Sequence, residues 1–208
     1  FEDGEVKNKE GVIKAIKELV ANPKFGKTSS REVVACLPET KTFAKLIEVE
    51  KTADEIKKNI EAEVEKHVPM SIEDIYYDWQ IINDFRDLQQ ILIGAAQKKI
   101  VNQYTDLLNG AGLSVVALEI EPIAICRSLL AEESNKFKGV FDKNYGVIDI
   151  GAKRSSMTVY SKNTILFTLS IPISGEEITK EIAEKLEIEM DQAEKAKIIC
   201  GLDENKAQ

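Results

Sequence analysis

Residues 145–160 have the sequence Tyr-Gly-Val-Ile-Asp-Ile-Gly-Ala-Lys-Arg-Ser-Ser-Met-Thr-Val-Tyr. The pattern predicts an apolar strand that ends near Asp149, a short turn around Gly151, and a second strand that returns from Ser155. A carboxylate at the tip of a buried strand can hold a hydrated Mg²⁺. A glycine two residues later lets the backbone N–H groups of the turn approach phosphate oxygens closely. The alternative is an ordinary β-hairpin with Asp and Gly in its turn.

Strands and helices alternate on both sides of this segment. Before it, the periodicity predicts helices over residues 12–20, 56–64, 98–108 and 123–130, and strands over 32–37, 42–49, 75–82, 88–96 and 113–120. After it, we expect strands over 155–160 and 164–171 and helices over 174–186 and 190–199. Residues 52–55, Thr-Ala-Asp-Glu, have the pattern of a capping box. The charged segment 132–144 loses periodicity and is the expected linker.

The composition makes several classes of function improbable. The 208 residues include 28 Lys and Arg and 36 Asp and Glu, for a net charge of −8. Such a chain is a poor candidate for binding nucleic acid or an anionic membrane surface, and its apolar runs are far shorter than the ~20 residues of a transmembrane helix. His67 is the only histidine, so a two-His zinc site is excluded. The three cysteines are isolated, as expected of reduced core thiols.

The order of these elements resembles the actin and FtsA superfamily of nucleotide-binding proteins. The residues that match are Ala111-Gly112-Leu113, Glu121-Pro122, Asp149-Ile150-Gly151-Ala152, and the pair Glu194 and Lys197. Further phrases resemble the PilM family, the FtsA-like cytoplasmic component of type IV pilus assembly. Among them are Val34-Ala-Cys-Leu-Pro38, Ala117-Leu-Glu-Ile-Glu121 and Ile171-Pro-Ile-Ser-Gly175. This resemblance extends over nearly the whole chain.

The resemblance implies an α/β chain with an actin-like (ribonuclease H-like), two-lobed ATPase fold that is incomplete. We expect residues 1–40 and 97–143 to form the core of the first lobe and residues 144–208 to begin the second lobe. Residues 41–96 would form a small inserted α+β domain with the order strand-helix-strand-strand. The family's first phosphate hairpin and its glycine-pair adenosine motif have no counterpart in the sequence, so the chain resembles an internal fragment.

The resemblance also implies a site for ATP and Mg²⁺. Glu121 would position the attacking water or the Mg²⁺ shell, and Asp149 would hold the metal through water. The remaining nucleotide-binding residues would be Gly151, Ala152, Lys153, Gly175, Glu194 and Lys197. A first-turn acidic residue at Glu121 and a surface ion pair between Glu194 and Lys197 are the structural alternatives. We expect at most a slow ATPase, because the sequence is poor in general bases, and weak nucleotide binding by this chain.

The implied function is that of a cytoplasmic scaffold of type IV pilus assembly, held at the inner membrane through its partners, with ATP as a structural ligand or switch. Its partners would be the N-terminal cytoplasmic peptide of PilN, other inner-membrane and motor components of the pilus, and a second copy in a homo-oligomer. The peptide would add to a strand edge. The candidate contacts are Phe43, Lys45 and Ile47 on one strand and Tyr77 and Trp79, which share a face, on another. Tyr76 lies on the opposite face of that strand, and core packing is the alternative for this aromatic cluster.

Two other functions stay open at this point. One is an FtsA-like cell-division or filament-forming ATPase, which would be distinguished by a C-terminal amphipathic membrane helix. The other is a ferredoxin-like binding module without nucleotide, because residues 42–120 also fit a βαββαβ order.

Overall fold

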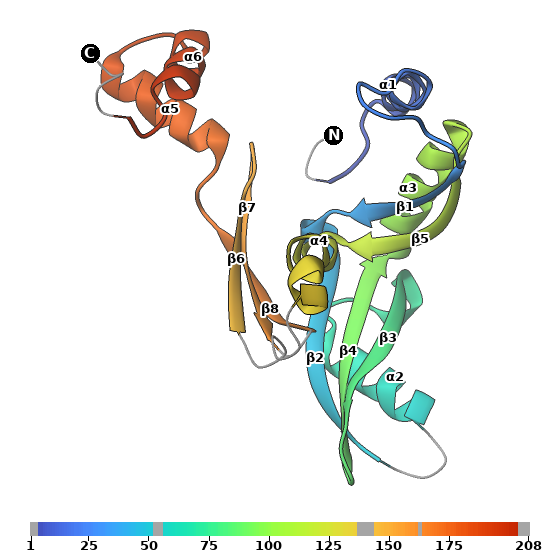
Figure 1. Cartoon of the computed structure of the whole chain (residues 1–208). Coiled ribbons are helices and arrows are strands. Elements are labelled where there is room, and N and C mark those ends of the chain that lie inside the picture. The colour runs from blue at the N-terminus through green and yellow to red at the C-terminus, as the bar shows by residue number, and fades with distance from the viewer. Residues whose placement is uncertain (1–3, 52–55, 137–143, 162–163, 204–208) are drawn as a thin grey trace. The chain divides into compact units, whose positions relative to one another are not determined.

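The computed structural model describes residues 4–51, 56–136, 144–161 and 164–203 (Figure 1). The chain forms two compact units. The first comprises residues 1–144 and 160–167, and the second comprises residues 145–159 and 168–208.

The first unit contains a two-stranded parallel sheet with helices beside it. β1 (Glu32–Leu37) pairs with β5 (Ser114–Ile120), and α1 (Lys9–Ala21) contacts α3 (Lys98–Gly110). α4 (Glu121–Lys136) follows β5 directly. The chain turns from α3 into β5 at Gly112, whose φ of +81° is a left-handed conformation that favours glycine. A small core of Leu37, Ala96 and Ile100 joins α3 to the strands.

A second, antiparallel sheet of the first unit lies between β1 and α3 in the chain. Its strands are β2 (Thr42–Glu50), β3 (Ile75–Asp84) and β4 (Leu88–Gln97), in the spatial order β2-β4-β3. α2 (Ile56–His67) packs against one face. Alternate residues of the strands point to that face and form a buried core with α2: Ile47, Val49, Ile60, Val64, Ile91 and Ile93. We call this sheet, with α2, the inserted sheet.

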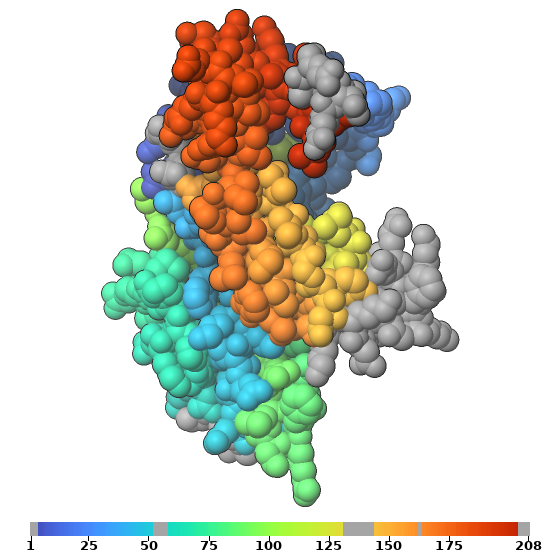
Figure 2. Space-filling model, turned by 90° about the vertical axis from the view of Figure 1, so that its left-hand side faces the viewer, coloured from blue at the N-terminus to red at the C-terminus, as the bar shows by residue number. Residues whose placement is uncertain are grey.

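The second unit contains most of a three-stranded sheet, followed by two helices; residues 160–167 belong to the first unit. The strands are β6 (Asn144–Ile150), β7 (Ser155–Ser161) and β8 (Thr164–Ile171), with β7 in the centre. α5 (Gly175–Leu186) and α6 (Met190–Cys200) pack on each other. Figure 2 shows these helices, in red, at one end of the unit and the strands, in orange, at the other. The hydroxyl of Ser174 accepts a hydrogen bond from the Glu177 N–H at 3.1 Å and so caps α5.

The sequence predicted the type and order of these helices and strands correctly. Its linker was placed too early, because α4 continues to Lys136; Ala131, Glu132 and Glu133 favour a helix even without an apolar stripe. β6 was predicted as an apolar strand; it forms one edge of its sheet, and Asp149 is exposed. The capping box at 52–55 lies outside the described residues, and the division into lobes at residues 40, 96 and 143 stays a prediction.

Candidate functional site

The turn between β6 and β7 is fastened to the beginning of α5. The N–H of Gly175 donates to the carbonyl of Gly151 at 3.0 Å, and the N–H of Glu176 donates to the carbonyl of Ala152 at 2.7 Å. Within the turn, the Gly151 N–H donates to the Arg154 carbonyl at 2.9 Å. A Cβ atom at Gly151 would lie 2.7 Å from that carbonyl oxygen, so only glycine fits. Turn and helix therefore form one fixed cradle.

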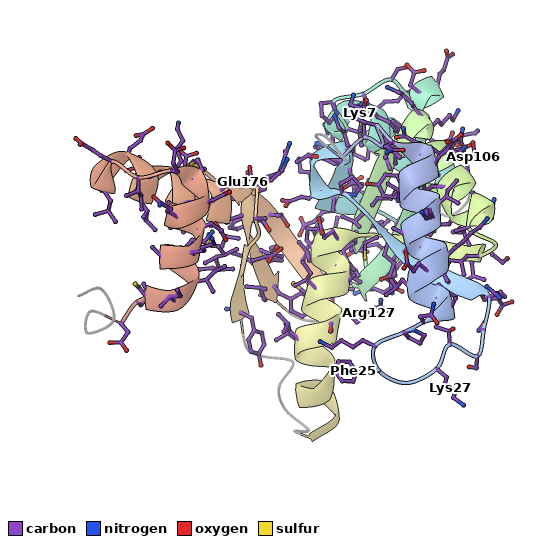
Figure 3. All side chains as sticks on the ribbon, turned by 90° about the horizontal axis from the view of Figure 1, so that it is seen from above. Lys7, Phe25, Lys27, Asp106, Arg127 and Glu176 are labelled. Carbon is purple, nitrogen blue, oxygen red and sulfur yellow. The ribbon has the colours of Figure 1, made fainter. Side chains whose placement is uncertain are left out.

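Two charged side chains flank this cradle. Asp149 is exposed near the end of β6. The ammonium of Lys153 lies 4.0 Å from the carboxylate of Glu176, which is labelled in Figure 3, and both side chains are exposed. Among the described residues no three His, Cys, Asp or Glu side chains form a metal-binding cluster. A cation near Asp149 would therefore keep most of its ligands as water, as Mg²⁺ does.

A polar network joins α6 to the first turn of α5. The Lys197 ammonium donates to the Gly175 carbonyl at 2.9 Å and to the Thr179 hydroxyl at 2.7 Å, and it lies 2.6 Å from the Glu194 carboxylate. Thr179, which is buried, also contacts Glu194. The hydrogen bond from Lys197, followed by that from Thr179, lowers the pKa of Glu194. The network thus places Glu194 and Lys197 beside Gly175, whose N–H is bonded to the turn.

The sequence analysis missed Thr179 in this network. Its spacing of four residues after Gly175 is the available signal, because a threonine hydroxyl on a helix can reach the carbonyl four residues earlier. Here that distance is 2.9 Å.

Glu121 belongs to the first unit, where it is the first residue of α4 and is exposed. Its carboxylate acts on two neighbours. The pKa of the Cys36 thiol is raised by partial burial and then by the charges of Glu119 and Glu121. The pKa of Tyr104 is raised by burial and then by Glu121. Cys36 is exposed, contrary to the expectation of a core thiol. The role of Glu121 in catalysis stays a prediction.

The expected peptide contacts lie on the face of the inserted sheet that α2 covers. Ile47 is 5% exposed, and Phe43, Tyr77 and Trp79 pack against the same core. The Tyr77 hydroxyl donates to Glu61 on α2 at 3.1 Å. The Lys45 ammonium is 3.0 Å from Nδ1 of His67, at the end of α2. The five residues thus lie on the face of the sheet that packs against α2.

The opposite face of the same sheet carries a groove of about 200 Å³. One wall is formed by β3 and β4, where Tyr76 pairs with Ala96 and Asp78 pairs with Gly94. The other wall comes from α3 and β5, through Val101, Leu118 and Ile120.

Two residues determine the shape of this groove; Gly94 was missed in the sequence analysis, and Tyr76 was named there but not chosen as a candidate contact. Tyr76 is 48% exposed, and the Lys98 ammonium lies 5.6 Å from its ring centre. Gly94 leaves space opposite Ile120, because a Cβ atom there would lie 3.1 Å from Cδ1 of Ile120. The period-two alternation that placed Tyr77 and Trp79 on one face also placed Tyr76 on the other, and that was the available signal.

Comparison with known proteins gives consistent results. The family model described as type IV pilus assembly protein PilM matches residues 1–208. The chain is 28% identical to the cell division protein FtsA of Bacillus subtilis (strain 168) over 106 residues. These residues are 50% of this chain and 22% of FtsA.

Two solved structures show the fold. The PilM-PilN type IV pilus biogenesis complex matches with a TM-score of 0.78 and 25% identity, over 95% of this chain and 58% of that chain. MreB5 of Spiroplasma citri bound to ADP matches with a TM-score of 0.50 and 14% identity, over 97% of this chain and 44% of that chain. The predicted actin-like ATPase fold is confirmed. The chain spans between about a fifth and three fifths of these proteins, and no described helix is long and apolar enough to cross a membrane.

Proposed function

This chain belongs to the PilM family of type IV pilus assembly proteins, and from that premise we propose that it binds an extended cytoplasmic segment of PilN along β3. The observation that carries the proposal is the groove beside this strand, which Tyr76, Gly94 and Leu118 line. A solved structure similar to this chain is described as a PilM-PilN complex. The binding would make this protein a cytoplasmic scaffold, peripheral to the inner membrane through PilN.

The position of β3 supports this mode of binding. β3 is an edge strand of the inserted sheet, paired with β4 on one side. The backbone groups on its other side would pair with an extended peptide, which gains main-chain hydrogen bonds in this way. Alternate peptide side chains would enter the groove, whose apolar walls at Val101, Leu118 and Ile120 would select apolar anchors.

The groove lies on a sheet whose other face is closely packed. The core of the inserted sheet on the α2 side contains Ile60, Ile91 and Ile93, each 0% exposed, so binding would need little ordering of the strand itself. A preorganised site loses less conformational entropy on binding. Affinity would then depend on apolar anchors more than on salt, because exposed charges at the rim act mainly on the association rate.

A fluorescence-anisotropy titration of a labelled PilN N-terminal peptide tests the proposal. We expect Tyr76→Ala to weaken binding about tenfold, since it removes an aromatic wall of the groove. Phe85→Ala is the matched control, because Phe85 is 53% exposed in the turn after β3 and does not line the groove. Equal affinities of the two variants and the parent chain, or no binding by the parent chain, would overturn the proposal.

We further propose that Mg²⁺ and ATP bind at the cradle of the second unit as a structural ligand. The donor chemistry fits: an exposed carboxylate at Asp149, a cation at Lys153, and a tight glycine turn held against α5. Mg²⁺ with nucleotide would supply phosphate oxygens and a divalent charge that join these groups. Glu194 and Lys197 would hold α6 beside the cradle, in addition to any contact with the nucleoside. MreB5, which shares the fold, is described as bound to ADP.

Binding of a fluorescent ATP analogue, with and without Mg²⁺, tests this second proposal. We expect weak, Mg²⁺-dependent binding that Asp149→Ala reduces about tenfold or more, because the carboxylate that orients the hydrated metal is lost. Asp191→Ala, an exposed acidic residue in the first turn of α6, is the control. Binding that does not depend on Mg²⁺ or on Asp149 would show that Asp149 is only a residue of the hairpin.

A further inference from the structure

Basic residues are concentrated in one short part of an acidic chain. Residues 14–31 contain five Lys or Arg and one Glu. The rest of the chain contains 23 Lys or Arg and 35 Asp or Glu. The five are Lys14, Lys17, Lys24, Lys27 and Arg31, and all are exposed. The net charge of −8 argued against binding to an anionic membrane, but it is a sum over the whole chain and does not show that the basic residues are grouped in one segment. Residues 14–31 therefore carry a formal net charge of +4, against −12 for the rest of the chain.

An exposed aromatic side chain lies in the middle of this basic segment. Phe25, in the loop between α1 and β1, is 83% exposed, and the ammonium of Lys24 lies 5.5 Å from its ring centre. Figure 3 shows Phe25 and Lys27 on this loop, whereas Lys7 lies beyond the other end of α1. A phenyl ring exposed to this degree buries almost none of its apolar surface, so it contributes little to the core.

The loop is nevertheless held in place at both ends. The Thr28 hydroxyl donates to the carbonyl of Val20 at 3.0 Å, near the end of α1. At the other end, the N–H of Ser114 donates to the carbonyl of Arg31 at 2.8 Å. The loop encloses a hollow whose lining includes Lys27, Thr28, Ser29, Ser30 and Arg31. Its cations and hydroxyls are the groups that hydrogen-bond a phosphate ester.

We propose that the loop Asn22–Arg31, with the adjoining end of α1, binds the surface of an anionic lipid bilayer. Phe25 enters the boundary between headgroups and acyl chains, while Lys17, Lys24 and Lys27 stay at the level of the lipid phosphates. Two interactions hold peripheral segments to a membrane: the attraction of basic side chains to anionic lipids and the burial of an apolar side chain. The surface needs neither the peptide groove nor the nucleotide cradle.

A bilayer fits these features better than an acidic polypeptide. An acidic polypeptide would pair with the cations but would leave the phenyl ring of Phe25 in water. A bilayer accepts both, because its charged headgroups lie directly above an apolar layer. Each Lys at such a surface strengthens binding about fivefold.

Sedimentation of the chain with lipid vesicles tests the proposal. We expect binding to vesicles of phosphatidylcholine with phosphatidylglycerol, and little binding to phosphatidylcholine alone. The double variant Lys24→Glu/Lys27→Glu should bind at least about tenfold more weakly, and Phe25→Ser should also bind more weakly. The matched controls are Lys180→Glu/Lys185→Glu on α5 and Phe85→Ser, another exposed phenylalanine, and both should bind as the parent does.

A Phe25→Trp variant reports the environment of the loop tip. Its emission, measured against the parent chain with its single Trp79, should shift to shorter wavelength on addition of the anionic vesicles. An unchanged emission, no preference for anionic vesicles, or equal losses in the controls would overturn the proposal. Displacement of the chain from vesicles by inorganic phosphate would show an ion site instead, and binding to polyglutamate but not to vesicles would show a surface for an acidic polypeptide.

Discussion

The inserted sheet and the sheet of β6, β7 and β8 both contain strands rich in apolar residues, but their surroundings differ. In the inserted sheet, α2 covers the apolar face, so that Ile91 and Ile93 are 0% exposed. In the second unit, Ile148 and Ile150 of β6 are 61% and 64% exposed, and Leu169 of β8 is 50% exposed. The apolar residues of a strand therefore do not show by themselves which of its faces is covered. The stability of the inserted sheet comes from packing, whereas a polar network joins the helices of the second unit.

The largest expected effect separates these two sheets directly. Ile93→Ala should destabilise the inserted sheet by about 3–4 kcal/mol, because it opens a cavity in a closed core. Ile148→Ala, the same change on an exposed strand, should cost less than about 1 kcal/mol. Urea unfolding followed by circular dichroism measures both variants, and the fluorescence of Trp79, which packs on the inserted core, isolates the first transition. Equal losses would show that β6 is as well packed as β4.

An intermediate effect is expected between α5 and α6. Thr179→Val should destabilise the second unit by about 1–2 kcal/mol, because it removes the buried hydroxyl that Lys197 and Glu194 share. Thr105→Val in α3 is the matched control, since its hydroxyl donates to the Val101 carbonyl four residues earlier, at 2.8 Å, and should cost less than about 0.5 kcal/mol. Thermal unfolding of the two variants gives the comparison. An unchanged melting temperature for Thr179→Val would mean that apolar contacts alone hold the two helices together.

The smallest effect concerns pH. The pKa of Glu194 in the folded chain lies below its ordinary value of 4.5, chiefly through the hydrogen bond from Lys197. A lowered folded pKa stabilises the fold above the unfolded value, and this contribution is lost as the pH falls through the folded pKa. The parent chain should therefore melt at a higher temperature than Glu194→Gln at neutral pH, and the difference should shrink below pH 4.5. A difference that stays constant over this range would show that the ion pair is not the cause.

Local pattern was sufficient for the elements of the fold. The spacing of Ile60 and Val64 and the alternation of Ile91 and Ile93 each reflect burial of one face. The end of α4 was misjudged because residues after Leu130 keep helix propensity but lose the apolar stripe, and propensity prevailed. Tertiary surroundings decided the exposure of β6, since an edge strand cannot be recognised from its own sequence.

The candidate site could be predicted only in part. The resemblance named Gly151, Ala152 and Gly175, and backbone hydrogen bonds bring these residues together; their role in nucleotide binding stays a prediction. The groove beside β3 joins Tyr76 and Gly94 to Leu118 across separate elements. Period-two alternation shows which residues of β3 share a face, but it does not show which face α2 covers. The aromatic pair Tyr77 and Trp79 was therefore chosen as a peptide contact, although it packs on the face that α2 covers.

Hydrogen exchange of the chain with and without the PilN peptide tests the proposed groove most directly. If the peptide adds to the edge of β3, amide exchange should slow in residues 75–84, because free edge N–H groups become hydrogen-bonded. The same measurement on Gly94→Val, whose side chain enters the groove opposite Ile120, should show little protection. Protection confined to residues 145–159 and 168–203, with none in β3, would contradict the account and place the peptide on the second unit.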